Sequence, residues 1–265
     1  MNGNRLQNGS ADPVRGALLR TDGRSIPYIW NLRGEHSSAL LCLHGFAGSK
    51  DSSVIAALRD SLDRKGAGVV TFDWPAHGES DAPDNFLTVE NCLSDLDHMV
   101  GRIRRQTRVP LSCFATSFGG YLATLYRNGH PNAFERLILR SPALKMSKVF
   151  RGLLPEEDFA AMMRGEKIVM GYERKMSLGR DFYESLCGHD AFSPDPPAPE
   201  NILILQGDRD DVVDPADTIA YAERTGAGIR VFPGADHLYQ NPGEKARIVK
   251  EAELFLYSNA NNPPL

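Results

Sequence analysis

The sequence lacks any long hydrophobic run, any strong excess of one charge and any dense set of cysteines. No apolar stretch among its 265 residues approaches the length that spans a bilayer, so we expect no membrane partner. The formal net charge is -4, with acidic and basic residues interspersed, which argues against a nucleic-acid partner. The first residues contain no apolar core of the kind that a signal peptide needs, so export by that route is not expected.

The four cysteines, Cys42, Cys92, Cys113 and Cys187, are scattered along the chain. Cys42 and Cys113 lie inside apolar runs, where a free thiol behaves as a small hydrophobic side chain. A reduced, cytoplasmic setting is therefore the simplest interpretation of the cysteine content.

Short apolar runs alternate with longer segments of helical periodicity, the pattern of a mostly parallel sheet flanked by helices. Six runs are rich in Val, Ile and Leu without strict alternation, as strands buried on both faces should be. They lie at 38–44, 68–74, 109–115, 136–142, 201–207 and 228–234. A more alternating run at 26–32 is interpreted as an antiparallel edge strand. Helices are predicted near 52–65, 89–106, 118–129, 216–225 and 243–258.

The interval 144–195 breaks this alternation, because it carries no strand signal yet holds many apolar and aromatic residues. A structureless loop of that length is unusual in a compact domain, so we predict a small helical insertion. Prolines at 193–200 favour an extended linker back to the sheet. We therefore expect one α/β core, residues 1–143 and 196–265, interrupted by the insertion.

Ser117 lies between a predicted strand and a predicted helix, in the run CFATSFGGYLA. It can act as a nucleophile there, or it can merely cap the helix. A hydroxyl nucleophile needs a base within hydrogen-bond reach and a third group that orients the base. The last two predicted strands run into DRDDVVDP and ADHLY, so an acid and a histidine follow Ser117 in the chain.

Residues 115–119 resemble the Gly-x-Ser-x-Gly nucleophile elbow of the α/β hydrolases, with Ala115 in place of the first glycine. The resemblance covers about residues 25–258 and implies the α/β-hydrolase fold. It also implies a catalytic triad in the chain order serine, acid, histidine, which begins with Ser117 as the nucleophile.

Asp210 and His237 complete this triad by the same resemblance. Gly207, Asp210 and Val213 match the family's Gly-x-x-Asp-x-x-Val pattern, and His237 follows the last strand in a Gly-x-x-His turn. An EF-hand calcium loop does not fit, because Val213 stands where that loop needs glycine. We interpret the remaining aspartates as solvated residues or turn formers, namely Asp208, Asp211 and Asp214.

Two backbone N–H groups are implied as the oxyanion hole of an acyl-transfer site. The run LHGFAGSK at 43–50 resembles the family's His-Gly-x loop, which assigns one donor to Phe46. Phe118 supplies the other, since its amide begins a helix whose dipole favours negative charge. His44 is expected to support this loop rather than to transfer protons.

The run FDWPAHGES at 72–80 resembles the family's Asp-x-x-Gly-His-Gly-x-Ser turn, with Ala76 in place of the first glycine. We interpret it as framework. Asp73 has no histidine and carboxylate cluster around it at ligand spacing, so neither a metal nor another cofactor is expected.

A serine at the nucleophile position argues against haloalkane dehalogenases and epoxide hydrolases, which use an aspartate.

Residues 171–186 are similar to bacterial cinnamoyl and feruloyl esterases and to serine-aminopeptidase-like, or monoacylglycerol-lipase-like, hydrolases. In related hydrolases an insertion at this position is a lid over the active site. Its Met and aromatic side chains could line an apolar pocket, or they could form the core of the lid itself.

The function predicted from these features is a serine carboxylesterase. It would hydrolyse small to medium acyl or aromatic, cinnamoyl-type esters through an acyl-enzyme. The same triad could instead serve a lysophospholipase or monoacylglycerol lipase, a thioesterase, or an amide or peptide hydrolase, and a non-catalytic ligand-binding protein is the remaining alternative. The expected partner is a small-molecule ester, and a homodimer is allowed for, since the sequence does not decide the oligomeric state.

Overall fold

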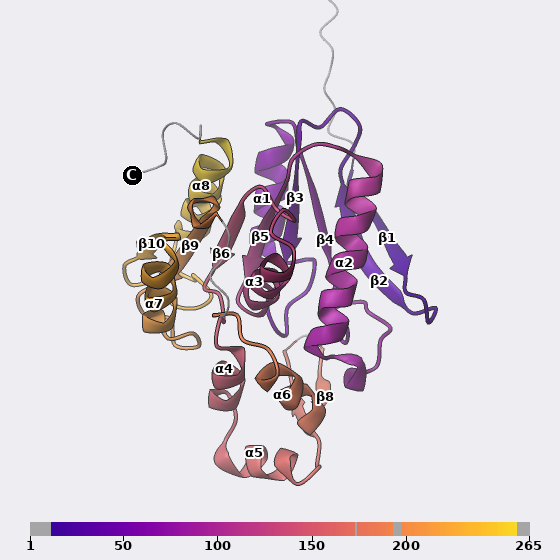
Figure 1. Ribbon diagram of the computed structural model, residues 1–265, viewed down its shortest axis with the longest axis vertical. Coiled ribbons are helices and arrows are strands. Elements are labelled where there is room, and N and C mark those ends of the chain that lie inside the picture. The colour runs from indigo at the N-terminus through magenta and orange to yellow at the C-terminus, as the bar shows by residue number, and fades with distance from the viewer. Residues whose placement is uncertain (1–11, 173, 193–197, 259–265) are drawn as a thin grey trace, which may run out of the picture.

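A central sheet of eight strands organises the chain (Figure 1), which a computed structural model describes over residues 12–172, 174–192 and 198–258. In spatial order the strands are β1 (Val14–Leu19), β2 (Ser25–Asn31), β4 (Ala67–Phe72), β3 (Ser38–Leu43), β5 (Leu111–Thr116), β6 (Leu137–Arg140), β9 (Ile202–Gly207) and β10 (Gly228–Phe232). The pairs β1–β2 and β2–β4 are antiparallel and the others are parallel. The predicted mostly parallel sheet is therefore confirmed.

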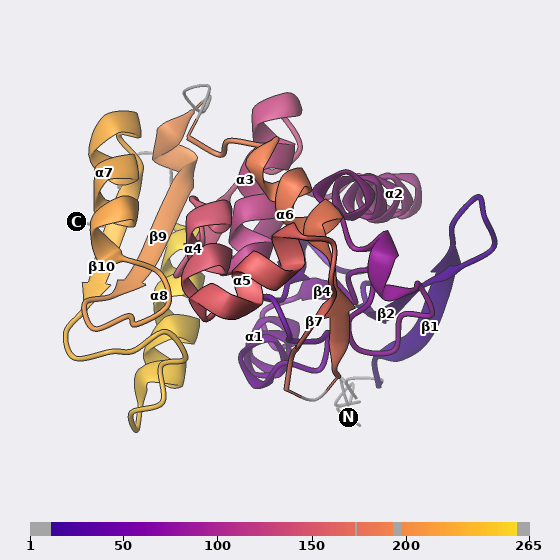
Figure 2. The same cartoon turned by 90° about the horizontal axis from the view of Figure 1, so that it is seen from below.

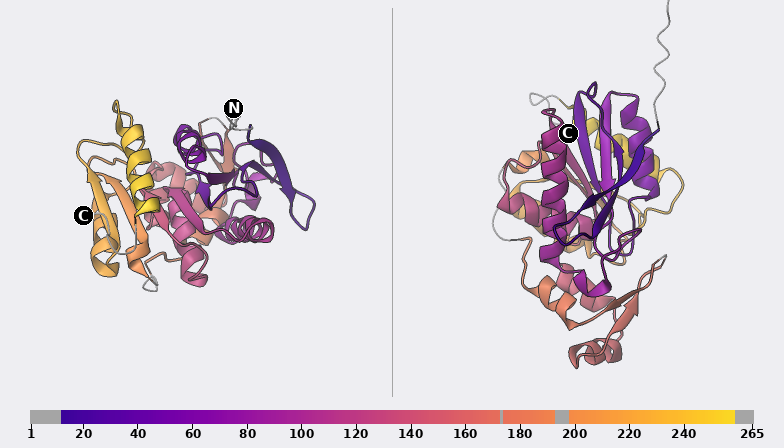
Figure 3. Two further views of the ribbon diagram at one scale, coloured as in Figure 1. Left: turned by 90° about the horizontal axis from the view of Figure 1, so that it is seen from above. Right: turned by 90° about the vertical axis from the view of Figure 1, so that its right-hand side faces the viewer.

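Helices cover both faces of this sheet, as predicted. Figure 3 (left) shows α1 (Ser53–Asp63) and α8 (Glu244–Tyr257) on one face. The other face carries α2 (Val89–Gln106), α3 (Phe118–Gly129) and α7 (Pro215–Thr225). Neighbouring residues of one strand join different cores, since Leu41 belongs to the α2–α3 side and Leu40 to the α1–α8 side. This two-sided burial explains the continuous apolar runs in the sequence.

The edge of the sheet differs from the prediction. The run at 26–32 forms β2, which is antiparallel as expected, but β1 pairs with it and takes the edge position. Four of the six residues of β1 are exposed and the other two are half-buried, as expected for an outer strand. Because β1 contains Arg15 and Gly16 between its apolar residues, it lacks the dense apolar run that marked the other strands.

The segment between β6 and β9 lies beyond the carboxyl ends of the strands, at the bottom of Figure 1 and nearest the viewer in Figure 2. It contains α4 (Met146–Gly152), α5 (Glu156–Met163), β7 (Ile168–Met170), β8 (Met176–Leu178) and α6 (Arg180–Cys187). The prediction of helices was correct, but the prediction of no strand was wrong, because β7 and β8 pair as an antiparallel hairpin. Three-residue strands are too short for an alternating pattern to be recognised.

Short 3₁₀ turns at Asp84–Phe86 and Pro199–Asn201 complete the secondary structure. Most of the predicted linker at 193–200, and the first residues considered for a signal peptide, fall outside the described residues. Within the described ranges, no helix is both long enough and apolar enough to cross a membrane.

Candidate functional site

Ser117 occupies the sharp turn between β5 and α3, with backbone angles φ 50° and ψ -113°. A positive φ is strained for a side chain other than glycine, and such strain is typical of functional positions. The turn brings α3 close to the neighbouring chain, because a Cβ at Gly119 would lie 2.6 Å from the carbonyl oxygen of His44. The Ser117 side chain makes no capping hydrogen bond to α3, so the alternative of a simple helix cap is not what the structure contains.

The Ser117 hydroxyl instead faces His237, with 3.1 Å between Oγ and Nε2. The other ring nitrogen of His237 lies 2.9 Å from Oδ2 and 3.0 Å from Oδ1 of Asp210. Ser117, His237 and Asp210 come from the ends of three different strands and form one buried, hydrogen-bonded chain. The structure thus brings together the three side chains that the sequence analysis selected.

Asp210 is held by three donors besides His237. The backbone N–H groups of Val212 and Val213 donate to Oδ1 at 3.0 and 2.8 Å, and the amide of Gln206 donates to Oδ2 at 3.1 Å. Burial raises the pKa of Asp210, but its bonds to His237 and to the other donors outweigh burial and bring the pKa below its ordinary value. Asp210 is therefore an ionised carboxylate with a fixed orientation.

The other aspartates of this loop have separate tasks. Asp208 accepts the N–H of Gly234 at 2.6 Å, and Asp214 caps α7 through the N–H of Ala216. Asp211 is exposed on the wall of the cavity described below. None of the three contacts His237, so the loop offers the histidine one carboxylate, that of Asp210.

The backbone N–H groups of Phe46 and Phe118 have no hydrogen-bond acceptor among the described residues. Phe118 begins α3, where the first amides of a helix are free to bind an anion. The ring of Phe46 is packed in an aromatic cluster, stacked on Phe182 of α6 at 5.9 Å and edge-on to Phe118 and Phe150 at 6.1 Å each. This packing fixes the loop that carries the Phe46 amide.

A cavity of about 660 Å³ opens over Ser117 and His237. The core and the β6–β9 segment both contribute to its apolar walls, which include Phe46, Met146, Val149, Leu153, Leu154, Val169, Met170, Val212 and Leu238. Other residues of the same segment are fully buried and do not line the cavity, namely Phe150 and Met162. The two alternatives for the apolar residues of the insertion are therefore both realised, by different side chains.

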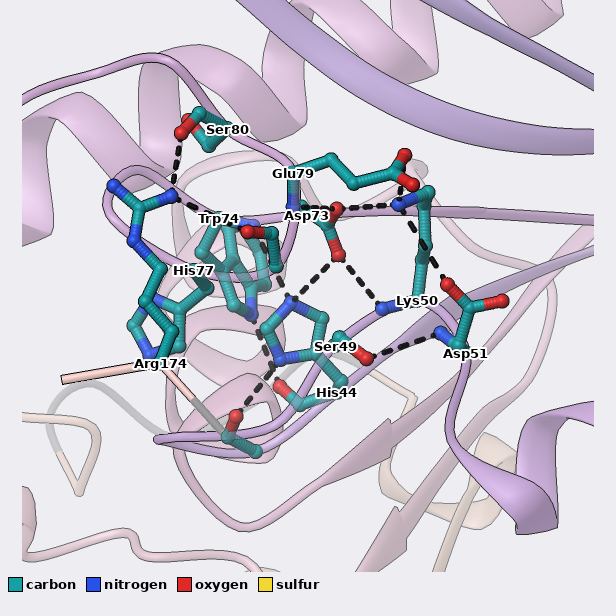
Figure 4. A network of polar contacts seen from close by, with 12 residues as sticks. His44, Ser49, Lys50, Asp51, Asp73, Trp74, His77, Glu79, Ser80 and Arg174 are labelled. Carbon is teal, nitrogen blue, oxygen red and sulfur yellow. Dashed lines mark hydrogen bonds and ion pairs between the residues drawn. The ribbon is translucent and has the colours of Figure 1, made fainter. Parts of the chain in front are cut away.

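A charged network around the buried Lys50–Asp73 pair, which the sequence analysis did not recognise, lies beside the loop after β3 (Figure 4). The Lys50 ammonium, only 1% exposed, lies 2.7 Å from Oδ2 of Asp73 and 2.7 Å from the Glu79 carboxylate. Both oxygens of Asp73 also accept backbone N–H groups, from Lys50 at 2.8 Å and from Glu79 at 2.9 Å. The network ties the loop after β3 to the loop after β4.

The β7–β8 hairpin contacts the loop after β4 as well. Arg174, between the two strands, donates to the carbonyl oxygens of Gly78 and Ser80 at 3.3 and 2.5 Å (Figure 4). Asp73, which was interpreted as framework, is thus part of an ion pair that organises the loop. In the described part of the chain, no group of three or more His, Cys, Asp or Glu side chains is placed to hold a metal ion.

His44 and His77 lie between these loops as neutral, buried imidazoles. His44 Nδ1 is 2.8 Å from the Gly45 carbonyl and Nε2 accepts the N–H of Trp74, so His44 supports the loop. Burial lowers the pKa of His44 to about 4 and that of His77 to about 3, from an ordinary value of 6.5.

These two imidazoles predict acid sensitivity. As pH falls from about 6.5 to about 4, the unfolded chain binds protons that the folded state does not, so the free energy of unfolding should fall by up to about 1.4 kcal/mol per pH unit for each histidine. Urea unfolding at a series of pH values measures this slope. The variant His77→Gln should have a shallower slope, and an unchanged slope would contradict the assignment.

Comparisons with known proteins identify the family and the fold. Residues 34–171, just over half of the chain, match the serine aminopeptidase S33 family, Hydrolase_4. Over 116 residues the chain is 33% identical to a Bacillus subtilis (strain 168) protein named as a 2-succinyl-6-hydroxy-2,4-cyclohexadiene-1-carboxylate synthase. That match spans 41% of this chain and 39% of the length of the relative.

Two solved structures share the fold over nearly the whole chain. Mouse alpha/beta hydrolase domain-containing protein 10 superimposes with a TM-score of 0.76 at 17% identity, covering 92% of this chain and 98% of that one. Est1E from Butyrivibrio proteoclasticus, solved with ferulic acid, gives a TM-score of 0.76 at 18% identity, covering 91% of this chain and 99% of that one. Together with the family match over the β3–β7 region, these findings make the chain a member of the serine aminopeptidase S33 (Hydrolase_4) family of α/β hydrolases.

Proposed function

We propose that this α/β hydrolase is a serine carboxylesterase that forms an acyl-enzyme on Ser117. The observation that carries the proposal is the hydrogen-bonded chain from Ser117 through His237 to Asp210, whose first two members line a cavity with apolar side chains in its wall. A serine hydroxyl, an imidazole within reach and a carboxylate behind it are the groups that acyl transfer needs. We also propose that residues 144–195 act as the lid over this cavity.

In the proposed reaction His237 Nε2 accepts the hydroxyl proton while Ser117 Oγ bonds to the ester carbonyl carbon. The N–H groups of Phe46 and Phe118 stabilise the resulting oxyanion. His237 then gives its proton to the alkoxy leaving group, which departs as an alcohol. A water molecule, deprotonated by the same imidazole, then attacks the acyl-enzyme carbonyl. The bond to Ser117 Oγ breaks, His237 returns the proton to Oγ, and the carboxylic acid is released. Asp210 holds the tautomer of His237 and stabilises the imidazolium throughout.

The side chains of the cavity wall favour a substrate whose acyl or aryl group is apolar and is buried on binding. Side chains of α4 and of the β7–β8 hairpin face the same space as Ser117, and methionines such as Met146 and Met170 adapt to irregular shapes. Est1E, which shares this fold, has been solved with a small aromatic acid, ferulic acid. We therefore propose small to medium acyl and cinnamoyl-type aromatic esters as substrates.

The test is covalent labelling combined with a substrate panel. A fluorophosphonate probe should add one adduct mass to the purified protein and no mass to Ser117→Ala, because the label bonds to Oγ. An unlabelled wild type that also hydrolyses no ester would overturn the proposal, in favour of a non-catalytic binding protein.

The substrate panel separates the alternatives that share the triad. We expect p-nitrophenyl butyrate and methyl ferulate to have higher kcat/KM than an acyl thioester, a monoacylglycerol, a lysophospholipid or an aminoacyl anilide. If one of the latter compounds has the highest kcat/KM, Ser117 remains the proposed nucleophile, but the proposed substrate class is wrong.

A further inference from the structure

Arg140, the last residue of β6, carries a buried guanidinium without an ionic partner. The residue is 7% exposed, and its Nε is buried with no hydrogen-bond partner. No carboxylate of the described residues forms an ion pair with it, and burial lowers the pKa of the guanidinium below its ordinary value. A buried charge of this kind costs stability compared with an apolar side chain of similar size. Packing alone therefore does not account for an arginine at this position.

The Arg140 side chain contacts the loop that carries His237. Its Nη2 donates to the carbonyl oxygens of His237 at 3.3 Å and Leu238 at 2.8 Å. The guanidinium also lies over the ring of Tyr239, 4.6 Å from the ring centre. The hydroxyl of Tyr239 in turn donates to the carbonyl of Leu205 in β9 at 3.0 Å. These contacts tie residues 237–239 to β6 and β9.

The Arg140 main chain contacts the nucleophile. The N–H of Ser117 donates to the Arg140 carbonyl at 3.0 Å, and the carbonyl of Ser117 accepts the N–H of Ala143 at 3.1 Å. Residues 140–143 therefore hold the strained turn at Ser117 from both sides. Arg140 is thus bonded to the serine through its backbone and to the histidine loop through its side chain.

We propose that Arg140 is a positioning residue that sets the distance between Ser117 Oγ and His237 Nε2. The inference rests on the proposed function, in which proton transfer between these two atoms is required. Tyr239, two residues after His237, has φ 55°, so the loop contains a strained residue that needs outside contacts to keep its course. The two hydrogen bonds that Nη2 of Arg140 donates to this loop supply such contacts.

The first experiment compares Arg140→Met with a matched control, Arg127→Met. Arg127 is also a buried arginine that donates to a main-chain carbonyl, that of Ala198, but it lies at the end of α3 far from Ser117 along the helix. We expect Arg140→Met to lower kcat by about 10- to 100-fold, with KM nearly unchanged, because misplacement of a catalytic group by about 1 Å costs this much. Arg127→Met should leave kcat unchanged, whatever its effect on the melting temperature.

A second readout needs no turnover and separates this inference from the proposed function. In the wild type, the Nδ1 proton of His237 that faces Asp210 should give a strongly downfield proton NMR signal. Arg140→Met should broaden or remove this signal, and Arg127→Met should retain it. If the wild type hydrolyses no ester, the proposed function is wrong. If Arg140→Met retains the NMR signal of the wild type, the positioning role is wrong.

Arg140→Lys covers the case in which Arg140→Met does not fold. The ammonium keeps the charge, but it is carried on a flexible stem and lacks the planar guanidinium that lies over Tyr239 and places Nη2 near both carbonyls. We therefore expect kcat still to fall and the melting temperature to stay near that of the wild type. A folded Arg140→Met or, failing that, a folded Arg140→Lys with the kcat and NMR signal of the wild type would overturn the inference.

Discussion

Asp210→Asn is expected to lower kcat for ester hydrolysis by about 10⁴-fold with little loss of stability. Oδ1 of Asp210 accepts two backbone N–H groups, so an asparagine should place its oxygen there and its NH₂ group at the Oδ2 position. The NH₂ group would then donate to Nδ1 of His237 and force the tautomer that has a proton on Nε2. In that tautomer the imidazole cannot accept the proton of Ser117.

Gln206 makes this substitution tolerable for the fold. Its Nε2 donates to Oδ2 of Asp210, while its own Oε1 is buried without a partner. Rotation of the Gln206 amide would present Oε1 to the new NH₂ group and would lose the bond that Nε2 donates to the Gly207 carbonyl at 3.0 Å, a net cost of about 1 kcal/mol. The melting temperature of Asp210→Asn should therefore stay close to that of the wild type, which separates lost chemistry from lost structure.

The matched controls for Asp210→Asn are the same substitution at Asp211 and Asp208. Asp211 is exposed and Asp208 holds a turn through Gly234, so neither variant should change kcat by more than a small factor. Steady-state kinetics with one p-nitrophenyl ester measures all three. If Asp211→Asn, rather than Asp210→Asn, showed the large loss of kcat, the assignment of the acid would be wrong.

Lys50→Met is expected to lower the free energy of unfolding by about 3–5 kcal/mol, the usual cost of leaving a buried charge without its partner. Asp73 is fully buried, and it would keep its two backbone donors but lose the ammonium 2.7 Å away. Burial lowers the pKa of Lys50, but the bonds to Asp73 and Glu79 outweigh burial and raise it above its ordinary value, so the pair is ionised. Urea unfolding followed by circular dichroism gives the difference.

Lys65→Met is the control for this prediction, since its ammonium also lies 2.7 Å from a carboxylate, that of Glu253, but its side chain is 44% exposed. Water screens an exposed pair, so its loss should cost less than about 1 kcal/mol. Adding Asp73→Asn to Lys50→Met should recover part of the stability, because it removes the uncompensated charge. Equal losses for Lys50→Met and Lys65→Met would contradict the account of the buried network.

The sheet and the candidate triad could be predicted because both depend on short patterns along the chain. Each strand buried on two faces is a dense apolar run, and the ends of parallel strands meet at one edge, which brings Ser117, Asp210 and His237 together. The edge strand β1 and the β7–β8 hairpin were missed, because mixed or three-residue runs carry too little periodicity. The assignment of the three residues to catalysis stays a prediction.

Arg140 and Lys50 could not be found in this way. In the sequence they are ordinary charged residues beside apolar runs, and their buried state follows from partners far along the chain: the loop after β10 for Arg140 and the loop after β4 for Lys50. The same holds for the insertion, where Met146 lines the cavity and Met162 does not. Such a division depends on how α4 and α5 are docked, which local patterns do not specify.

The aromatic cluster around Phe46 limits how the substrate range of this enzyme can be changed. The amide of Phe46 is one of the two proposed oxyanion donors, and its ring packs against Phe118 of the core and against Phe150 and Phe182 of the insertion. We therefore expect mutational libraries that replace aromatic residues of the insertion with smaller ones also to loosen an amide that the proposed reaction uses. Selection for bulkier esters should consequently favour changes at rim positions such as Val169 and Leu238, which are exposed and outside the cluster.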